Sequence, residues 1–292
     1  MRLATLALGD RPTLGVVRSR WVEPVPVGPG RPMSMMQVIR EFDRHRAYLQ
    51  GLAEVASPAS RPLDDVELLA PLPDPGKVVA VGLNYVDHAG ESQQALPAEP
   101  LLFAKFPSSI IGPSASITWD AGLTTAVDFE AELAVVIGRR ARHVPTTDAL
   151  SHVFGYTCLN DVSARDLQFS DGQWVRAKSL DTFCPMGPVI VTADEIRDPQ
   201  GLRIGCRVDG QTMQEATTAD MVFGVAELIA YVSRSLTLEP GDVIATGTPP
   251  GVGYFRDPRR LLEDGDSVTV WIEGIGELTN DVRVTDASRA PD

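Results

Sequence analysis

The sequence predicts a mostly β protein of the α+β class: a mixed β-sandwich roll with peripheral helices and a small N-terminal domain. Short apolar segments rich in valine and isoleucine recur along the chain, and glycine, proline and aspartate separate them. After residue 70 only two helices are convincing, so strands and helices do not alternate as a doubly wound sheet requires. The 292 residues suffice for one large domain and a small one.

Residues 1–70 are expected to form the small N-terminal domain. Residues 1–22 alternate loosely between apolar and polar side chains and predict a pair of short strands, followed by a loop at 25–32. A helix is predicted from Ser34, its N-cap, to about Ala56. The segment SPASRPLDD then ends the unit, because proline and aspartate favour turns.

Residues 71–292 are expected to form the second domain. Its predicted strands are VVAVGL, ELAVVIG, GPVIVT, RIGCRVDG, GDVIATG and SVTVWIEG. One helix is predicted after Asp161, in SARDLQ, and another over 221–234. Many short strands with few helices favour a sandwich or roll.

The composition excludes several classes of protein. The net charge of −13, with no cluster of Lys and Arg, argues against binding to nucleic acid or to an anionic membrane. No apolar run approaches the roughly 20 residues that cross a bilayer, and the apolar stretch at the N-terminus is too short for a signal peptide. We therefore expect a cytoplasmic enzyme. The three cysteines lack any CxxC spacing and are expected to be buried thiols.

Lysine is rare in this chain. Of the 26 basic residues only three are lysines: Lys77, Lys105 and Lys178. Where arginine supplies ordinary surface charge, a retained lysine favours a position that needs a compact ammonium group or a shiftable pKa. The three lysines are therefore candidates for functional roles.

The segment VDFEAELAVVIG (127–138) carries the strongest chemical signal. As a strand it places Asp128, Glu130 and Glu132 on one face, where three carboxylates repel one another. A hard divalent cation would relieve that repulsion, and oxygen ligands suit Mg²⁺ or Mn²⁺. The alternative is an edge strand with its acidic face in water. A metal site needs a further carboxylate, and Asp161 is a candidate because it ends an apolar segment and precedes a helix.

Six segments together resemble the fumarylacetoacetate hydrolase family, over about Lys77 to Val282. They are KVVAVGLNYVDHAGE, LLFAKFPSSIIGP, VDFEAELAVVIG, YTCLNDVSARDLQ, KSLDTFCPMGP and GDVIATGTPPGVG. The family includes acylpyruvate hydrolases, 2-hydroxyhepta-2,4-diene-1,7-dioate isomerases and oxaloacetate decarboxylase-like members. The resemblance implies the family's β-rich roll, with the active site at its mouth, and a homodimer.

The resemblance also implies one Mg²⁺ or Mn²⁺ ion held by Glu130, Glu132 and Asp161. Asp128 is then interpreted as a structural acid outside the ligand set. The pair His88 and Glu91 matches the family's water-activating dyad, although such a pair by itself is more typical of a surface contact.

Lys178 matches the family's catalytic lysine, which would neutralise charge that develops on a 2-oxo acid. Arg165, Gln168 and Thr248 match substrate contacts, and Lys105 is assigned a supporting role at the substrate. For Arg165, a salt-bridged helix residue is an equal alternative.

The function expected first is Mg²⁺- or Mn²⁺-dependent hydrolysis of a carbon–carbon bond in a 2,4-dioxo acid of the acylpyruvate or fumarylpyruvate type. The alternative is decarboxylation of oxaloacetate, or tautomerisation or isomerisation of a hydroxymuconate-type diacid. The motifs are shared among these reactions and do not separate them. A binding or scaffold protein without activity is disfavoured, because neither the dyad nor a metal ligand is missing.

Overall fold

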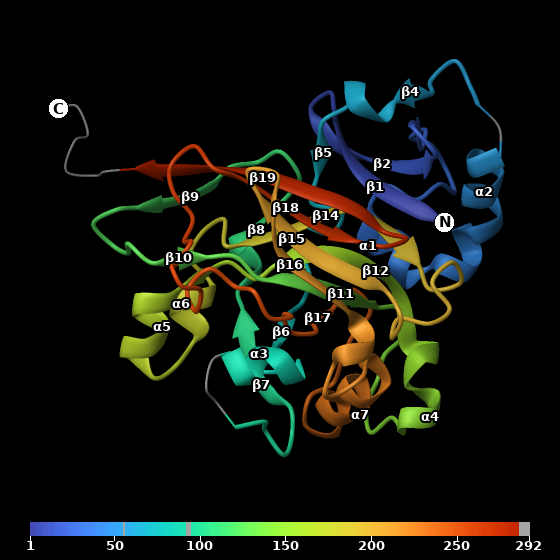
Figure 1. The fold of residues 1–292 in the computed structure, drawn as a ribbon. Coiled ribbons are helices and arrows are strands. Elements are labelled where there is room, and N and C mark those ends of the chain that lie inside the picture. Colours follow the sequence, from blue (N-terminus) through green and yellow to red (C-terminus); the bar gives the residue numbers. More distant parts are fainter. Residues whose placement is uncertain (55, 92–94, 286–292) are drawn as a thin grey trace.

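The computed structural model describes residues 1–54, 56–91 and 95–285. Two main β-sheets pack against each other, and the helices lie at the periphery (Figure 1). The predicted class, mostly β with a sandwich-like roll and peripheral helices, is confirmed. In the described ranges no helix has both the length and the apolar character to span a membrane.

The larger sheet contains twelve strands within the described residues, in the order β4-β3-β2-β1-β14-β12-β11-β17-β6-β7, with β5 on β1 and β8 on β14. Their bounds are β1 (Arg2–Leu8), β2 (Arg11–Arg18), β3 (Trp21–Pro24), β4 (Arg61–Pro62), β5 (Leu68–Leu69), β6 (Val78–Gly82), β7 (Leu101–Lys105), β8 (Ile110–Ile111), β11 (Ala131–Ile137), β12 (Val153–Asn160), β14 (Cys184–Thr192) and β17 (Val243–Ala245).

The second sheet has the order β16-β15-β18-β19-β9, and a further pair joins β10 to β13. Their bounds are β9 (Ile117–Asp120), β10 (Val127–Asp128), β13 (Ser163–Ala164), β15 (Arg203–Val208), β16 (Gln211–Thr217), β18 (Ser267–Ile272) and β19 (Gly276–Thr285). Most pairings are antiparallel, but β17 pairs in parallel with β6, β19 with β9 and β14 with β8.

The α-helices of the described chain are α1 (Met35–Arg40), α2 (Phe42–Glu54), α3 (Val86–Glu91), α4 (Thr146–Ala149), α5 (Arg165–Asp171), α6 (Val175–Lys178) and α7 (Val225–Ser235). Short 3₁₀ turns are η1 (Leu63–Asp65), η2 (Pro107–Ser109), η3 (Leu150–His152) and η4 (Thr218–Asp220). Both helices predicted after residue 70 are present, as α5 and α7. The short helices α4 and α6 have too few residues to show an apolar period.

The N-terminal helix differs from its prediction in one respect. Ser34 is the N-cap, and its side chain accepts a hydrogen bond from the backbone N–H of Gln37 at 3.2 Å. The single helix predicted over 34–56 is two helices, because the backbone of Glu41 leaves helical geometry. Residue 55 lies outside the described residues.

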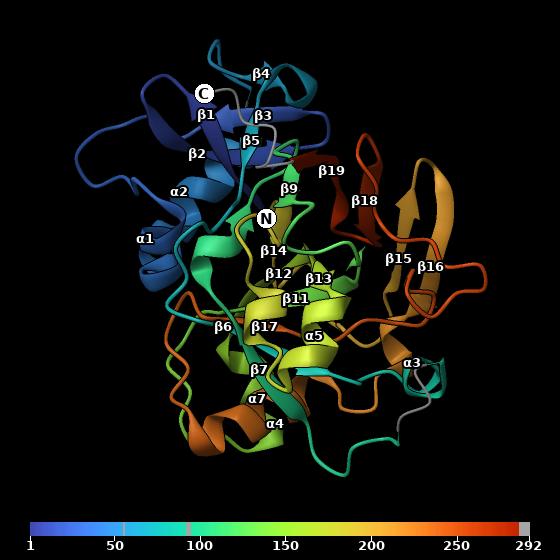
Figure 2. The same ribbon diagram turned by 90° about the vertical axis from the view of Figure 1, so that its left-hand side faces the viewer.

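The sheet is continuous across the predicted boundary at residue 70, since β1 pairs with β14 at Arg2↔Val191. The elements of residues 1–70 nevertheless gather at one end of the molecule, and α4 and α7 lie at the other end (Figures 1 and 2). The division into domains 1–70 and 71–292 stays a prediction about folding units.

Strand β11 lies at the centre of the large sheet, between β12 and β17. Every residue of it is buried, so the alternative of an edge strand with an acidic face in water is wrong. The predicted alternation is present, because Leu133 and Val135 belong to one apolar cluster and Ala134 and Val136 to the other. The acidic residues therefore point into the protein.

The predicted strand 127–138 is divided into β10 and β11. At the division, the backbone N–H of Glu130 donates to the side chain of Asn160 at 2.9 Å. The N–H of Ala131 donates to the side chain of Gln214, also at 2.9 Å. Side chains replace a neighbouring strand as acceptors here, so the ladder is interrupted at Glu130, between Asp128 and Glu132.

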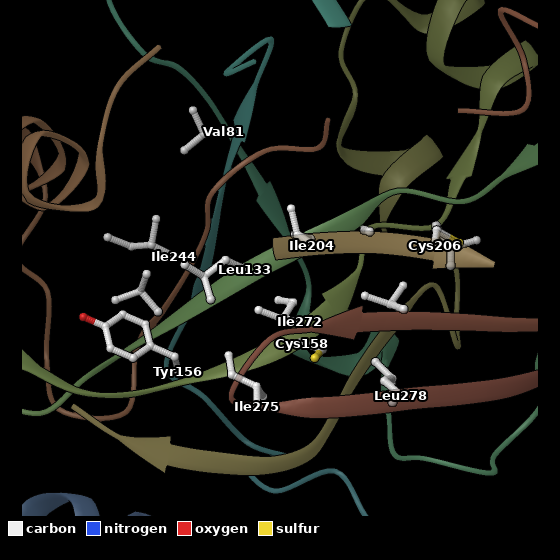
Figure 3. Close-up of a cluster of buried hydrophobic side chains, with 14 of the residues drawn as sticks. Val81, Leu133, Tyr156, Cys158, Ile204, Cys206, Ile244, Ile272, Ile275 and Leu278 are labelled. Carbon is white, nitrogen blue, oxygen red and sulfur yellow. The ribbon is translucent and has the colours of Figure 1, made fainter. Parts of the chain in front are cut away.

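The main hydrophobic core lies between the two sheets. Figure 3 shows Leu133 and Tyr156 of the large sheet opposite Ile204, Ile272 and Leu278 of the small one, and all five side chains are buried. This apolar layer fixes β11 and β12, the two strands that carry the acidic residues.

Candidate active site

Three buried carboxylates meet at one end of the paired strands β11 and β12. Glu132 lies on β11, Glu130 directly precedes that strand, and Asp161 directly follows β12. The antiparallel register pairs Ala131 with Asn160, which brings the three together. One oxygen atom from each lies within 4.8 Å of the others.

Glu132 is held by the loop that follows β17. The backbone N–H of Gly247 donates to its carboxylate at 2.9 Å. Gly247 has φ +93°, and a Cβ there would lie 2.7 Å from Cβ of Asn84. Only glycine fits this close approach without strain. In the described part of the chain, Glu132 forms no ion pair with a basic side chain.

Glu130 and Asp161 are bridged by one lysine. Nζ of Lys178 lies 2.8 Å from Glu130 Oε2 and 2.9 Å from Asp161 Oδ2. Lys105 approaches Asp161 from another side, with Nζ 2.6 Å from Oδ1, and also donates to the backbone oxygen of Lys178. Two of the three lysines of the chain thus lie in one buried cluster, as the rarity of lysine suggested.

Arg165 forms ion pairs, as expected if it is a salt-bridged helix residue. Its guanidinium contacts Asp128 Oδ2 at 2.8 Å and Glu130 Oε1 at 2.7 Å, and donates to Gln168 at 3.0 Å. Asp128 also accepts backbone hydrogen bonds from Gly253 at 2.7 Å and Tyr254 at 3.1 Å. Asp128 is therefore a structural acid that joins Arg165 to the 253–254 loop.

The electrostatics differ between the carboxylates. Burial acts to raise the pKa of Glu130, but Lys178 and Arg165 outweigh it and hold that pKa well below its usual range. Burial and the charges of Asp161 and Glu130 together raise the pKa of Glu132 well above its usual range. Burial opposes the charge of Lys178, yet Asp161 and Glu130 raise its pKa above the ordinary value.

This donor set fits an oxygen-preferring divalent cation. Four buried carboxylates (Asp128, Glu130, Glu132 and Asp161) face three buried basic side chains (Lys105, Arg165 and Lys178), and Glu132 is the carboxylate without an ion-pair partner among the described residues. Three carboxylates without cysteine or histidine suit Mg²⁺ or Mn²⁺ better than Zn²⁺. The oxygen donors of this cluster therefore support the expectation of Mg²⁺ or Mn²⁺.

His88 and Glu91 lie on α3, one helical turn apart, as predicted. His88 Nδ1 is 3.3 Å from Glu91 Oε2. The backbone N–H of Gly251 lies 3.1 Å from both oxygens of Glu91, so the dyad is tied to the loop after β17. With Nδ1 facing a carboxylate, Nε2 is the nitrogen available for proton transfer.

A cavity joins the dyad to the carboxylate cluster. Counted with its open mouth, the space has a volume of about 440 Å³. Its lining residues are Val81, Gly82, Leu83, His88, Phe103, Glu130, Arg165, Gln168, Phe169, Trp174, Lys178, Thr248 and Phe255. The structure thus brings most of the predicted catalytic and substrate-binding residues to one pocket. Lys105 is absent from the lining and lies behind Asp161.

Sequence analysis missed residues that shape this pocket. Gln214 on β16 donates to Thr248 at 2.8 Å and fixes its hydroxyl. Trp174, Phe103 and Phe255 supply aromatic walls. Phe103 and Trp174 stand beside lysines in the segments LLFAKF and WVRAK, a signal that could have found them. Gln214 lies in an ordinary strand pattern, so the sequence gives no such signal for it.

Comparison with known proteins agrees with this geometry. The family model described as fumarylacetoacetate (FAA) hydrolase C-terminal matches residues 77–283. The human oxaloacetate tautomerase FAHD2A, whose name marks it as mitochondrial, is 49% identical over 223 residues, which are 76% of this chain and 71% of that protein. Oxaloacetate tautomerase YisK of Bacillus subtilis (strain 168) is 41% identical over 261 residues. The match covers 86% of this chain and 87% of that protein.

Among solved structures, a 2-hydroxyhepta-2,4-diene-1,7-dioate isomerase from Mycobacterium marinum superposes with a TM-score of 0.77 at 38% identity. The match covers 98% of this chain and 99% of that chain. The predicted cytoplasmic location stays a prediction. The family model alone spans most of the chain and every catalytic and metal-binding candidate. This chain belongs to the fumarylacetoacetate hydrolase family.

Proposed function

We propose that this chain catalyses keto–enol tautomerisation of a small 2-oxo diacid of the oxaloacetate type, with Mg²⁺ or Mn²⁺ held by Glu130, Glu132 and Asp161. The observation that supports it most is one pocket lined by a base, His88, and an ammonium group, Lys178, beside the carboxylate cluster. The names of the human and Bacillus relatives favour this reaction over carbon–carbon hydrolysis, which sequence analysis put first.

Tautomerisation removes a proton from C3 of the acid and adds one to the oxygen at C2, or the reverse. The substrate and the product have the same atoms, so no co-reactant is needed. His88 removes or returns the C3 proton, and Glu91 keeps Nδ1 occupied so that Nε2 acts. Lys178 lies where negative charge develops on the C2 oxygen. When bound, the cation polarises the 2-oxo and carboxylate groups of the substrate.

The dyad does not distinguish hydrolysis from tautomerisation, since both need a base. Hydrolysis requires His88 to deprotonate a water molecule, whereas tautomerisation requires it to act on carbon-bound hydrogen. The dyad therefore gives no reason to prefer hydrolysis. Decarboxylation of oxaloacetate needs the same stabilised enolate and remains the second candidate.

The test follows the enol form of oxaloacetate by its ultraviolet absorbance and the products by NMR, with Mg²⁺ or Mn²⁺ present. Faster ketonisation without pyruvate supports tautomerisation. Pyruvate and carbon dioxide from oxaloacetate would favour decarboxylation instead. Pyruvate and a carboxylic acid from acylpyruvates would favour hydrolysis. The expected homodimer stays a prediction, and light scattering of the purified protein tests it.

A further inference from the structure

The pocket lining combines polar and apolar side chains. The polar ones are His88, Glu130, Arg165, Gln168, Lys178 and Thr248, and the apolar ones are Val81, Leu83, Phe103, Phe169, Trp174 and Phe255. Nζ of Lys178 lies 5.4 Å from the centre of the Phe103 ring, and that ring packs against Trp174. Substrate atoms next to those that Lys178 binds therefore meet this aromatic wall.

Trp174 lines the pocket through an unusually close contact with the backbone. A Cβ built on Gly82, the last residue of β6, would lie 2.5 Å and 3.1 Å from two ring carbons of Trp174. No other amino acid at position 82 leaves the indole where it is. Gly82 thus allows this ring to lie directly on the end of a strand.

A neighbouring ring holds the indole in place. The indole packs edge-on against Phe103, with ring centroids 5.3 Å apart and an angle of 70° between the planes. The backbone oxygen of Trp174 accepts a hydrogen bond from the N–H of Lys178 at 3.0 Å. The indole therefore belongs to the same short segment as the pocket lysine.

We propose that Trp174, seated on Gly82 and against Phe103, sets the longest C3 substituent that the site accepts. This proposal rests on the proposed function and narrows its substrate class to short 2-oxo acids. A rigid wall rejects a longer chain sterically, and one methylene in a pocket changes selectivity by about 10- to 200-fold. The competing explanation is that Trp174 only supports Lys178, in which case its loss lowers kcat for every acid alike.

The experiment compares wild type with Trp174→Ala on 2-oxobutanoate, 2-oxohexanoate and 2-oxooctanoate, with Mg²⁺ present. Exchange of the C3 hydrogens with D₂O, followed by NMR, reports enolisation of each acid. Calorimetry on the same metal-loaded proteins reports binding. We expect Trp174→Ala to raise kcat/KM for 2-oxooctanoate relative to 2-oxobutanoate by about 10-fold or more. The ratio of the two dissociation constants should shift the same way. An equal loss for all three acids, with no change in either ratio, would overturn the proposal.

Trp21→Ala is the matched control, because Trp21 lies on β3 with 47% of its side chain exposed and does not line the pocket. It should leave the length preference unchanged. The binding arm separates the two hypotheses. If wild type does not accelerate the enol-to-keto conversion of oxaloacetate but Trp174→Ala binds the long acid better, the proposed reaction fails and the length limit stands. If wild type exchanges hydrogen and the preference does not move, the length limit alone fails.

A double-mutant cycle tests the contact itself. Gly82→Ala adds a methyl group where the indole lies, so it should lower kcat/KM for 2-oxobutanoate by displacing the ring. In the Trp174→Ala background the same substitution meets no ring and should cost much less. Equal costs in both backgrounds would mean that Gly82 does not act through Trp174, and the proposal would fail.

Discussion

Lys178 joins the carboxylate cluster to the pocket. Its ammonium group lies within 3 Å of both Glu130 and Asp161 and also lines the cavity. Lys105 contacts Asp161 as closely but does not reach the cavity. Two buried ammonium groups on one carboxylate therefore have different access to a substrate.

Lys178→Met should lower kcat for enolisation by roughly 10²- to 10³-fold, the loss typical of one electrostatic stabiliser. Lys105→Met should lower kcat less, because Lys105 acts on Asp161 and not on the substrate. Steady-state kinetics on both variants, with circular dichroism to check folding, measures the difference. A near-normal kcat in Lys178→Met would remove the lysine from the chemistry.

Within the described carboxylate cluster, Glu132 is the carboxylate that forms no ion pair with a basic side chain. Its pKa is raised because it is buried beside Asp161 and Glu130. In EDTA, Glu132→Gln should therefore unfold at a temperature equal to or above that of wild type, since it removes a repelled charge. With Mg²⁺ the order should reverse, because only wild type gains stability from the ion, about 2.7 kcal/mol at 100 times Kd.

Differential scanning fluorimetry of both proteins with and without Mg²⁺ measures this reversal. Glu263→Gln is a matched control, since that glutamate lies outside the cluster. If Mg²⁺ stabilised Glu132→Gln as much as wild type, Glu132 would not be a ligand.

His88→Ala should lower enolisation by roughly 10²- to 10⁴-fold, the contribution of a positioned base. His152→Ala is the control, because the His152 ring lies 3.3 Å from the backbone oxygen of Arg139 and does not line the pocket. Calorimetric Mg²⁺ affinity should remain at the wild-type value in both variants. Loss of metal binding in His88→Ala would assign the histidine to the ion rather than to proton transfer.

Among the elements, the loop after β17 connects the parts of the site. Its residues donate to Glu132 from Gly247, to Glu91 from Gly251 and to Asp128 from Gly253. Arg256 holds the same loop by donating to the backbone oxygen of Gly251 at 3.1 Å. One segment thus sets the position of the cluster relative to the dyad.

Asp128→Asn should loosen this loop and release Arg165, because a neutral amide keeps the shape but loses the ion pair. We expect KM to rise by about tenfold or more while Mg²⁺ affinity changes little, since Asp128 lies outside the proposed ligand set. Kinetics measures KM and calorimetry measures the Mg²⁺ affinity of the same preparation. Unchanged KM would mean that Arg165 and the loop keep their places without Asp128.

Short-range patterns, together with the family resemblance, predicted much of this site. The period of two along 127–138 located Glu130 and Glu132, and the breaks around Asp161 located the third carboxylate. The helical spacing of His88 and Glu91 is confirmed. Such patterns depend only on neighbouring residues, so a single sequence contains them in full.

Contacts between distant segments were not predictable in this way. Gln214 meets Ala131 from 83 positions away, and Gly247 meets Glu132 from 115 positions away. Whether 127–138 was an edge strand or a central one depended on the pairing with β17, which no local pattern encodes. The same holds for Trp174 on Gly82. The fold class was predicted because it follows from many short elements, whereas each of these contacts depends on the complete packing of the sheets.

For the molecule as a whole, the account holds that one cation-binding carboxylate cluster, with Lys178 and the His88–Glu91 dyad, enolises a small 2-oxo acid. The most direct measurement is the initial rate of enol-to-keto conversion of oxaloacetate by one protein preparation, first stripped of metal with EDTA and then restored with Mg²⁺ or Mn²⁺. The account predicts loss of the enzymatic rate on stripping and its return with either ion, but no return in Glu132→Gln. An undiminished rate in metal-free protein, or no acceleration by the metal-loaded wild type, would contradict it.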